Sequence, residues 1–429
     1  MARLRLLSYL SGLSLFLALC LAAQSVAPVV TVDHGPNTAE QQAKPYVVLV
    51  SLDGFRYDYA RKYGARHLLA LGAQGAIAAQ GMIPAYPSLT FPNHYTLVTG
   101  LYPEHHGIVA NNFYDPIRKQ HYSSSDPATA SDGSWYGGTP LWVLAEKQGM
   151  RSACFFWPGS EAEIDGARPA YYLKFDDHFP DAKRIDQVIA WLRMPAAQRP
   201  HLITLYYSNV DHAGHQYGPD SPQTAEAVAH VDQLMGDLWT QLSRLQLPVD
   251  LFVVSDHGME QEQGSWIDLD KYTDLANFTT AGSLLYSNSE AAAEKAYQEL
   301  KIKSDAFTVY RRNRVPAAFA YDYNPREGDP IIVSNGPYAI RAHAPASGAA
   351  DQPPARGVHG YDPRAMKSMR ALFIAVGPDI LPGSILQPFD NVNVYPLLAR
   401  ILGLNAPNVD GSLNVLSKIL KNPAAEDAP

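Results

Sequence analysis

The feature that most constrains this chain is a set of short, continuous apolar runs spread along its length. Such runs, apolar on both faces and bounded by turn residues, are typical of the central strands of a parallel sheet covered by helices on both sides. Between them lie segments with helical spacing of apolar residues, at 183–192 and 224–245. Strands that alternate with helices predict an α/β fold with a doubly wound, mostly parallel sheet. The runs occupy 46–52, 153–157, 202–207, 251–255 and 371–376.

The stretch 260–353 interrupts this alternation. It is rich in turns and charged residues and has only weak strand patterns, at 317–321, 331–333 and 338–342. In a chain of 429 residues there is room for such a unit beside the sheet. We predict a smaller inserted α+β lobe, with a closing helix at 392–402 in the main unit. The expected division is linker 28–44, main α/β core 45–259 and 354–420, inserted lobe 260–353 and tail 421–429.

The first 27 residues predict export. Arg3 and Arg5 precede a nearly all-apolar run, 6–23, which is followed by small residues, as in a secretory signal peptide. A retained anchor is the alternative, because the run approaches the roughly 18–20 residues that span a bilayer. Cleavage would leave Cys154 as the one thiol and no stable membrane span, which favours a bacterial periplasmic or secreted protein. The sequence does not indicate an oligomeric state.

Composition and charge exclude several classes of protein. Apolar residues make up 46% and aromatic residues 10% of the chain, too much of both for a disordered protein. The formal net charge of −8 argues against sequence-specific or broad nucleic-acid binding, which requires a basic face. A globular enzyme or a small-molecule-binding protein remains.

Acidic and imidazole side chains follow three of the apolar runs, and one more precedes the last run. Ligands of open α/β sheets collect outside the carboxyl ends of the strands, so we expect these groups at one rim. A single Asp there is more often a helix cap, but six such groups predict two zinc ions with three protein ligands each and open positions for catalysis. The predicted ligands are Asp53, Asp211, His215, Asp256, His257 and His359.

A candidate nucleophile lies between the first two ligand segments. Ser88 and Thr90 stand at a proline-bounded corner before the helical stretch 95–99, where a helix N-terminus favours negative charge. Helix capping is the ordinary role of such hydroxyls, and local sequence does not choose between the two residues. Asn111, slightly further along, offers an uncharged amide donor.

Six segments carry a family resemblance. The sequences VSLDGFRYDY, PSLTFPNHYTLVTGLYPEHHGIVANN, FFWPGSEAEI, YYSNVDHAGHQYGP, VVSDHGM and GVHGYDP resemble, in the same order, motifs of the nucleotide pyrophosphatase/phosphodiesterase family of the alkaline phosphatase superfamily. The match runs from about residue 46 to 404. Animal members of the family also carry small disulfide-rich domains and a nuclease-like domain, which this sequence lacks. In this respect the chain is similar to the compact bacterial type.

The resemblance implies a site and a reaction. Asp211, His215 and His359 would hold one zinc ion, and Asp53, Asp256 and His257 the other, together with Thr90, the attacking group. Asn111 would bind a phosphate oxygen. Phe91 and Tyr206 would stack on a nucleobase, with Tyr172 or Phe175 completing the slot.

The expected enzyme is a two-zinc phosphodiesterase I or nucleotide pyrophosphatase, a hydrolase that forms nucleoside 5′-monophosphates through a covalent phosphothreonine. A neutral donor such as Asn111 suits a singly charged diester, whereas a monoester dianion calls for an added cation; Arg56 or Arg118 would overturn this if either reached the site. One alternative keeps the chemistry and changes the substrate to choline-phosphate or lysophospholipid esters. Another is a periplasmic binding protein without catalysis, which would bind zinc but hydrolyse no phosphoester.

Overall fold

The computed structural model describes residues 28–303, 305–345 and 354–422, and a nine-stranded sheet forms its centre. The sheet order is β1-β7-β6-β8-β2-β9-β18-β3-β19. The neighbouring strands β7, β6, β8, β2 and β9 all run parallel to one another. Strand β18 is antiparallel to both of its neighbours, β9 and β3. The predicted α/β class with a mostly parallel sheet is therefore confirmed. The strands are β1 (Val30–Thr31), β2 (Tyr46–Leu52), β3 (Ala76–Ala78), β6 (Ser152–Phe155), β7 (Tyr171–Leu173), β8 (Leu202–Tyr207), β9 (Val249–Val254), β18 (Phe373–Val376) and β19 (Ser384–Leu386).

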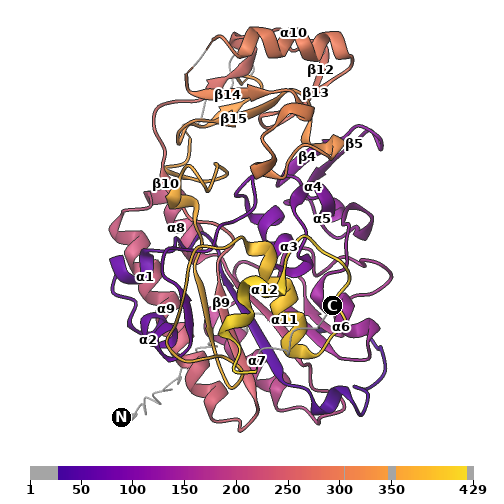
Figure 1. Ribbon diagram of the computed structural model, residues 1–429, viewed down its shortest axis with the longest axis vertical. Helices are drawn as coiled ribbons and strands as arrows, with labels where there is room; N and C mark the ends of the chain where they lie inside the picture. Colours follow the sequence, from indigo (N-terminus) through magenta and orange to yellow (C-terminus); the bar gives the residue numbers. More distant parts are fainter. Residues whose placement is uncertain (1–27, 304, 346–353, 423–429) are drawn as a thin grey trace, which may run out of the picture.

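Helices cover both faces of this sheet (Figure 1). Along β2, Val47 and Leu49 pack into one apolar cluster, and Val48 and Val50 into the other, so the strand is buried on both sides. This explains why its sequence is apolar throughout. The first cluster receives α3 (Thr90–Thr99), α6 (Leu141–Lys147), α11 (Val394–Leu402) and α12 (Leu413–Leu416). The second receives α1 (Tyr59–Lys62), α2 (Arg66–Gln74), α7 (Asp181–Leu192), α8 (Asn209–Tyr217) and α9 (Pro222–Ser243).

Two helix starts show how local sequence determines the elements. In α9, the Ser221 side chain accepts a hydrogen bond from the Thr224 N–H and Pro222 occupies the first turn, a favourable beginning for a helix. Helix α3 begins at Thr90, five residues earlier than the helical stretch that the sequence predicts. Pro92 suggested a break, but proline is tolerated within a first helical turn because its missing N–H has no partner there.

The segment between β9 and β18 forms a separate unit at one end of the sheet (Figure 1, orange). The chain leaves the core at β10 (Glu260–Gln261) and returns at β17 (Gly357–Val358), and these two strands pair with each other. The unit has its own apolar core. It contains β11 (Ile267–Asp268), β12 (Phe278–Ala281), β13 (Leu284–Ser287), α10 (Glu290–Leu300), β14 (Phe307–Tyr310), β15 (Ile331–Ser334) and β16 (Ile340–Arg341). Its packing fits an inserted lobe, and the boundaries 260 and 353 stay a prediction.

Two local expectations differ from the structure. Residues 317–321 do not form a strand; Ala317–Phe319 is a 3-10 helix that follows Pro316 and ends at Ala320, whose φ is +45°. The stretch 28–44, expected as a linker, contributes the edge strand β1, which pairs with β7.

A hairpin of the main unit contacts the lobe. It consists of β4 (Asn112–Asp115) and β5 (Gln120–Ser123), and the Tyr114 N–H donates to the Tyr286 hydroxyl of the lobe.

The remaining expectations concern the ends of the chain. Within 28–303, 305–345 and 354–422, no helix combines the length and the apolar character that crossing a membrane requires. The predicted signal peptide, 1–27, lies outside the described residues, as do residues 423–429 of the predicted tail.

Candidate active site

The six predicted ligands meet at the carboxyl ends of three neighbouring parallel strands. Asp53 directly follows β2, Asp211 lies in the first turn of α8 after β8, and Asp256 follows β9. The sheet order β8-β2-β9 places these three strand ends side by side. His359 is brought to the same rim by the chain that returns from the lobe through β17.

Each of the three predicted imidazole ligands is oriented by a backbone carbonyl. Nδ1 of His215 donates to the Gly357 oxygen (2.7 Å), Nδ1 of His257 to the Gly258 oxygen (2.9 Å), and Nδ1 of His359 to the Ser88 oxygen (2.9 Å). Because a carbonyl only accepts, Nδ1 carries the proton and Nε2 keeps a free lone pair. This arrangement is typical of histidines that bind a metal through Nε2.

The free nitrogens converge with the carboxylates. His215 Nε2 lies 3.2 Å from His359 Nε2 and 3.4 Å from Asp211 Oδ1. His257 Nε2 lies 3.5 Å from Asp53 Oδ1 and 2.9 Å from Asp256 Oδ2, and its ring stacks on that of His359 at 3.6 Å between centroids. Two lone pairs facing each other at 3.2 Å repel unless a cation lies between them. The arrangement is therefore that of a cation site.

The carboxylates also indicate a cation site. Asp53 Oδ1, Asp211 Oδ1 and Asp256 Oδ2 are buried and have no hydrogen-bond partner in the described structure, although buried carboxylate oxygens are normally paired. Burial raises the pKa of the Asp53 carboxyl well above its ordinary value, and the charges of Asp256 and Asp211 raise it further. Divalent cations would satisfy all three oxygens and relieve the repulsion.

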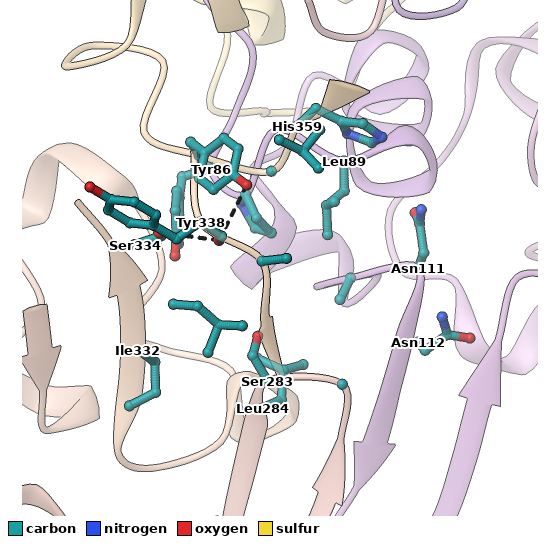
Figure 2. A pocket seen from close by; sticks show the side chains of 18 of the residues that line it. Tyr86, Leu89, Asn111, Asn112, Ser283, Leu284, Ile332, Ser334, Tyr338 and His359 are labelled. Atoms are coloured by element: carbon teal, nitrogen blue, oxygen red, sulfur yellow. Dashed lines mark hydrogen bonds between the residues drawn. The ribbon is translucent and has the colours of Figure 1, made fainter. Parts of the chain in front are cut away.

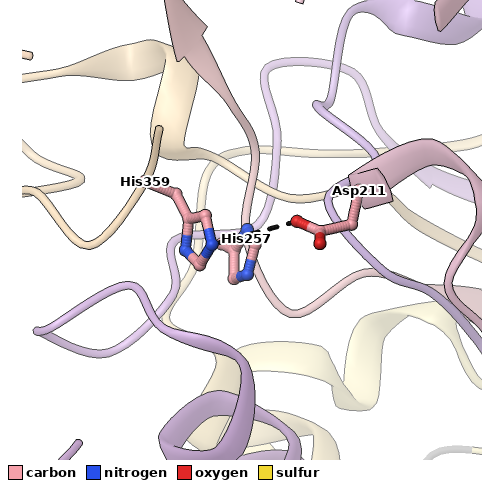
Figure 3. A group of neighbouring side chains, drawn as sticks. All are labelled: Asp211, His257 and His359. Carbon is pink, nitrogen blue, oxygen red and sulfur yellow. Dashed lines mark ion pairs between the residues drawn. The ribbon is translucent and has the colours of Figure 1, made fainter. Parts of the chain in front are cut away.

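Two groupings of three ligand atoms, each within 4.8 Å of one another, stand out among the described residues. One is Asp211, His257 and His359 (Figure 3), and the other is Asp53, Asp256 and His94. His94 was not a predicted ligand. Its Nδ1 donates to the Thr90 oxygen (2.9 Å) and its Nε2 contacts the Ser51 hydroxyl (2.8 Å), so both nitrogens are already used. His257, within reach of both carboxylates, fits the second group better than His94 does.

The structure separates the two candidate hydroxyls. Thr90 is the first residue of α3, and its Oγ1 lies 3.3 Å from His257 Nε2. Ser88 is buried, and its hydroxyl donates to the Tyr361 oxygen while accepting from the Gly360 N–H. The Ser88 hydroxyl therefore holds the turn after His359, whereas that of Thr90 faces the ligand cluster.

Asn111, the candidate hydrogen-bond donor to a phosphate oxygen, is held in place as well. Asn111 Oδ1 accepts from the Phe91 N–H at 2.9 Å, which leaves the amide Nδ2 available as a donor. The two arginines that could have balanced a monoester dianion are engaged elsewhere. Arg56 pairs with Asp58 at 2.6 Å, and Arg118 donates to Ser134 and lies over the Trp135 ring.

The predicted base-binding aromatic residues lie in different environments. Phe91, in the first turn of α3, is partly exposed. Tyr206 is nearly buried at the end of β8, and its hydroxyl donates to Asp53 Oδ2 at 2.7 Å, a contact that the sequence did not reveal. Tyr172 packs in the apolar core within β7, whereas Phe175 is 52% exposed and its ring centroid lies 6.2 Å from that of Tyr206.

With this geometry established, comparisons identify the family. Residues 47–362 match the model of type I phosphodiesterases and nucleotide pyrophosphatases. The chain belongs to this family. Its members are hydrolases, so the expected enzyme class and the expected family are confirmed, and the compact bacterial type stays a prediction.

The relatives agree in sequence and in fold. An uncharacterized pyrophosphatase/phosphodiesterase of Schizosaccharomyces pombe is 35% identical over 85% of this chain and 78% of its own length. Human ectonucleotide pyrophosphatase/phosphodiesterase family member 1 is 34% identical over 88% of this chain, which spans 42% of that protein. The solved structure of murine ectonucleotide pyrophosphatase/phosphodiesterase 5 has a TM-score of 0.81 and 30% identity, covering 88% of this chain and all of that one. The alkaline-phosphatase-like fold is thus confirmed.

Proposed function

We propose that this protein hydrolyses phosphodiester or pyrophosphate bonds of nucleotides and releases nucleoside 5′-monophosphates through a covalent phosphothreonine. The observation that carries the proposal is the position of the Thr90 hydroxyl, at the start of α3 and 3.3 Å from His257 Nε2. A solved relative, murine ectonucleotide pyrophosphatase/phosphodiesterase 5, was captured as an inactive threonine-to-alanine variant in complex with AMP. That complex supports both the nucleophile and the nucleotide.

Two zinc ions fit the residues present. Asp211, His215 and His359 would hold one, and Asp53, Asp256 and His257 the other, with Thr90 beside it. When bound, paired zinc ions lower the pKa of a nearby hydroxyl and compensate negative charge on both the attacking and the leaving oxygen.

The chain itself contributes position and charge. Thr90 Oγ1 attacks phosphorus, the leaving oxygen departs on the opposite side, and water then hydrolyses the phosphothreonine. The N-terminus of α3 favours the negative charge that collects there. Asn111 Nδ2 would donate to a non-bridging oxygen, which suits the single charge of a diester.

The nucleobase would lie against Phe91 and Tyr206. We propose Phe175 as the further wall of the slot, because its ring is exposed beside Tyr206 while Tyr172 is packed in the core. The relatives described above are nucleotide pyrophosphatases by name, and phosphocholine esters therefore serve as comparison substrates.

Replacing the nucleophile tests the function. Thr90→Ala should fold and hold zinc but hydrolyse p-nitrophenyl thymidine monophosphate at least about 10³-fold more slowly, since loss of a covalent nucleophile removes the main route. Thr90→Ser, which keeps a hydroxyl, should retain a substantial fraction of kcat. Zinc content by elemental analysis controls for the site. Near-normal turnover by Thr90→Ala, or faster turnover of p-nitrophenyl phosphocholine by the parent enzyme, would contradict the proposal.

We also propose that the enzyme acts in the periplasm or outside the cell. The support is the basic start, apolar run and small residues of segment 1–27. Sequencing the N-terminus of the protein recovered from a periplasmic or culture fraction should find a start between residues 23 and 28.

A further inference from the structure

A cavity of about 380 Å³ lies where the inserted lobe meets the rim of the sheet (Figure 2). This size is within the range of small-molecule sites. The rim contributes His215, His359 and Asn111, and the lobe contributes Leu284, Ile332 and Tyr338, among others. The cavity therefore opens directly onto one half of the ligand cluster.

The cavity lies on the side from which the leaving group departs. Thr90, Asp53 and Asp256 are absent from its lining, while His215 and His359 belong to it. In an in-line displacement, the attacking and the leaving oxygens lie on opposite sides of phosphorus. Thr90 attacks from the side of Asp53 and Asp256, so the departing oxygen points toward His215 and His359. Phe91 and Tyr206 are also outside the lining, which separates this cavity from the proposed base slot.

The described lining of the cavity has no side chain of the Lys, Arg, Asp or Glu type and is rich in aromatic rings. No lysine, arginine, aspartate or glutamate is among the described residues that line it, and four tyrosines and a tryptophan are. The polar groups are neutral, for example the side chains of Ser283 and Ser334. Arg341 adjoins the lining residue Ile340, and its guanidinium pairs with Asp268 and lies over the Trp266 ring. The cavity thus offers aromatic and aliphatic surface with neutral hydrogen-bond partners.

We propose that this cavity binds the leaving group, and that it selects an uncharged, aromatic one: the second nucleoside of a nucleotide diester. The proposal rests on the function proposed above and specifies its substrate class. A nucleoside would bury its base against the tyrosines and hydrogen-bond to serine and asparagine side chains. A zinc ion at His215 and His359 would compensate the charge on the departing oxygen, but the remaining negative charges of pyrophosphate, the leaving group of a nucleoside triphosphate, would meet a lining without a cationic side chain, at a desolvation cost.

Binding to an inactive enzyme tests this without turnover. Zinc-loaded Thr90→Ala is titrated calorimetrically with three thymidine compounds that share the same 5′-phosphoryl half: thymidylyl-3′,5′-thymidine, the methyl ester of thymidine monophosphate, and thymidine triphosphate. The dinucleotide should bind about tenfold or more tightly than the methyl ester. Equal affinities of these two, or a triphosphate that binds more tightly than the dinucleotide, would overturn the proposal.

A charge placed in the cavity provides a second test. Ser283 lies in the turn between β12 and β13, is partly exposed and lines the cavity, so Ser283→Lys should fold. It should lower the kcat/KM ratio of dinucleotide over triphosphate by about tenfold, a change of about 1.4 kcal/mol. Asn288→Lys adds the same charge at an exposed position of the same lobe outside this cavity and should leave the ratio unchanged. If Ser283→Lys and Asn288→Lys had the same ratio of kcat/KM for dinucleotide over triphosphate, the proposal would also be overturned.

The two proposals fail in different ways. If the parent enzyme hydrolyses none of the thymidine esters, the proposed function is wrong, and calorimetry still reports on the cavity. If it hydrolyses all three with equal kcat/KM and the dinucleotide binds no better than the methyl ester, only the leaving-group assignment is wrong.

Discussion

At the scale of single residues, hydrogen bonds determine which atoms are available for chemistry. The Nδ1–H groups of His215, His257 and His359 are all used by backbone carbonyls, which leaves three Nε2 atoms for cations. His94 is buried beside Asp256, yet both of its nitrogens are used. The identity of a ligand therefore depends on its partners as much as on its residue type.

Tyr206 shows the same dependence. Tyr206→Phe keeps the ring but removes the donor to Asp53 Oδ2, and lost support of a ligating carboxylate typically lowers metal affinity about 10–100-fold. We expect that loss in a competition titration with a zinc chelator, with the KM for nucleotide little changed. The control is Tyr207→Phe, whose hydroxyl donates to the Asp181 oxygen instead. An unchanged zinc affinity in Tyr206→Phe would show that the hydrogen bond does not support the ligand.

At the scale of elements, strand ends and the turns that follow them create the site. Sequence predicted each central strand, because continuous apolar runs reflect burial on two faces. It missed the true start of α3 at Thr90, because Pro92 is a helix breaker in most positions but is tolerated in a first turn. It also mistook 317–321 for a strand, because a short run of apolar residues does not reveal the left-handed Ala320 that ends the turn.

The turn after β2 is under a specific constraint. Gly54 has φ +67°, and an added Cβ would lie 2.9 Å from the Asp211 Cα. Gly64 has φ +68° with open space around it. Both Gly→Ala variants should lose roughly 1–2 kcal/mol of unfolding free energy, because a side chain in the left-handed region is strained. Only Gly54→Ala should also lose bound zinc and activity, measured by elemental analysis and thymidine ester turnover. If Gly54→Ala and Gly64→Ala kept the same amounts of bound zinc and activity, the close approach of Gly54 to Asp211 would not matter for the site.

At the scale of the whole molecule, acidic groups are buried at both ends of the sheet for different reasons. At the carboxyl end they form the predicted ligand cluster, and the inserted lobe lines a cavity beside His215 and His359. At the other end, Asp250 near the start of β9 accepts from the Asp379 N–H and has an oxygen without a partner. That second carboxyl has no part in the proposed chemistry but affects stability.

Asp250 should make stability depend on pH. Burial raises its pKa from 3.8 to about 8, and the charge of Asp379 adds to this. The folded state then binds more protons than the unfolded state, so this contribution is full below about pH 4 and is lost as the pH rises to about 8. Asp250→Asn should flatten the fall of unfolding free energy over this window in urea titrations. Asp237→Asn, an exposed substitution on α9, should not. A slope unchanged in Asp250→Asn would contradict the prediction.

The sequence by itself determined the five central strands and predicted the ligand types and the order in which they occur, because burial on two faces and polar residues at strand ends leave local patterns. The family resemblance of the sequence already favoured Thr90 over Ser88. Only the tertiary structure showed how these two hydroxyls are engaged, oriented the imidazoles, exposed Phe175 instead of Tyr172, and joined the lobe to the rim. These features depend on contacts between distant parts of the chain, such as Thr90 with His257, which lie 167 positions apart. No local pattern records such contacts, since packing alone brings their atoms together.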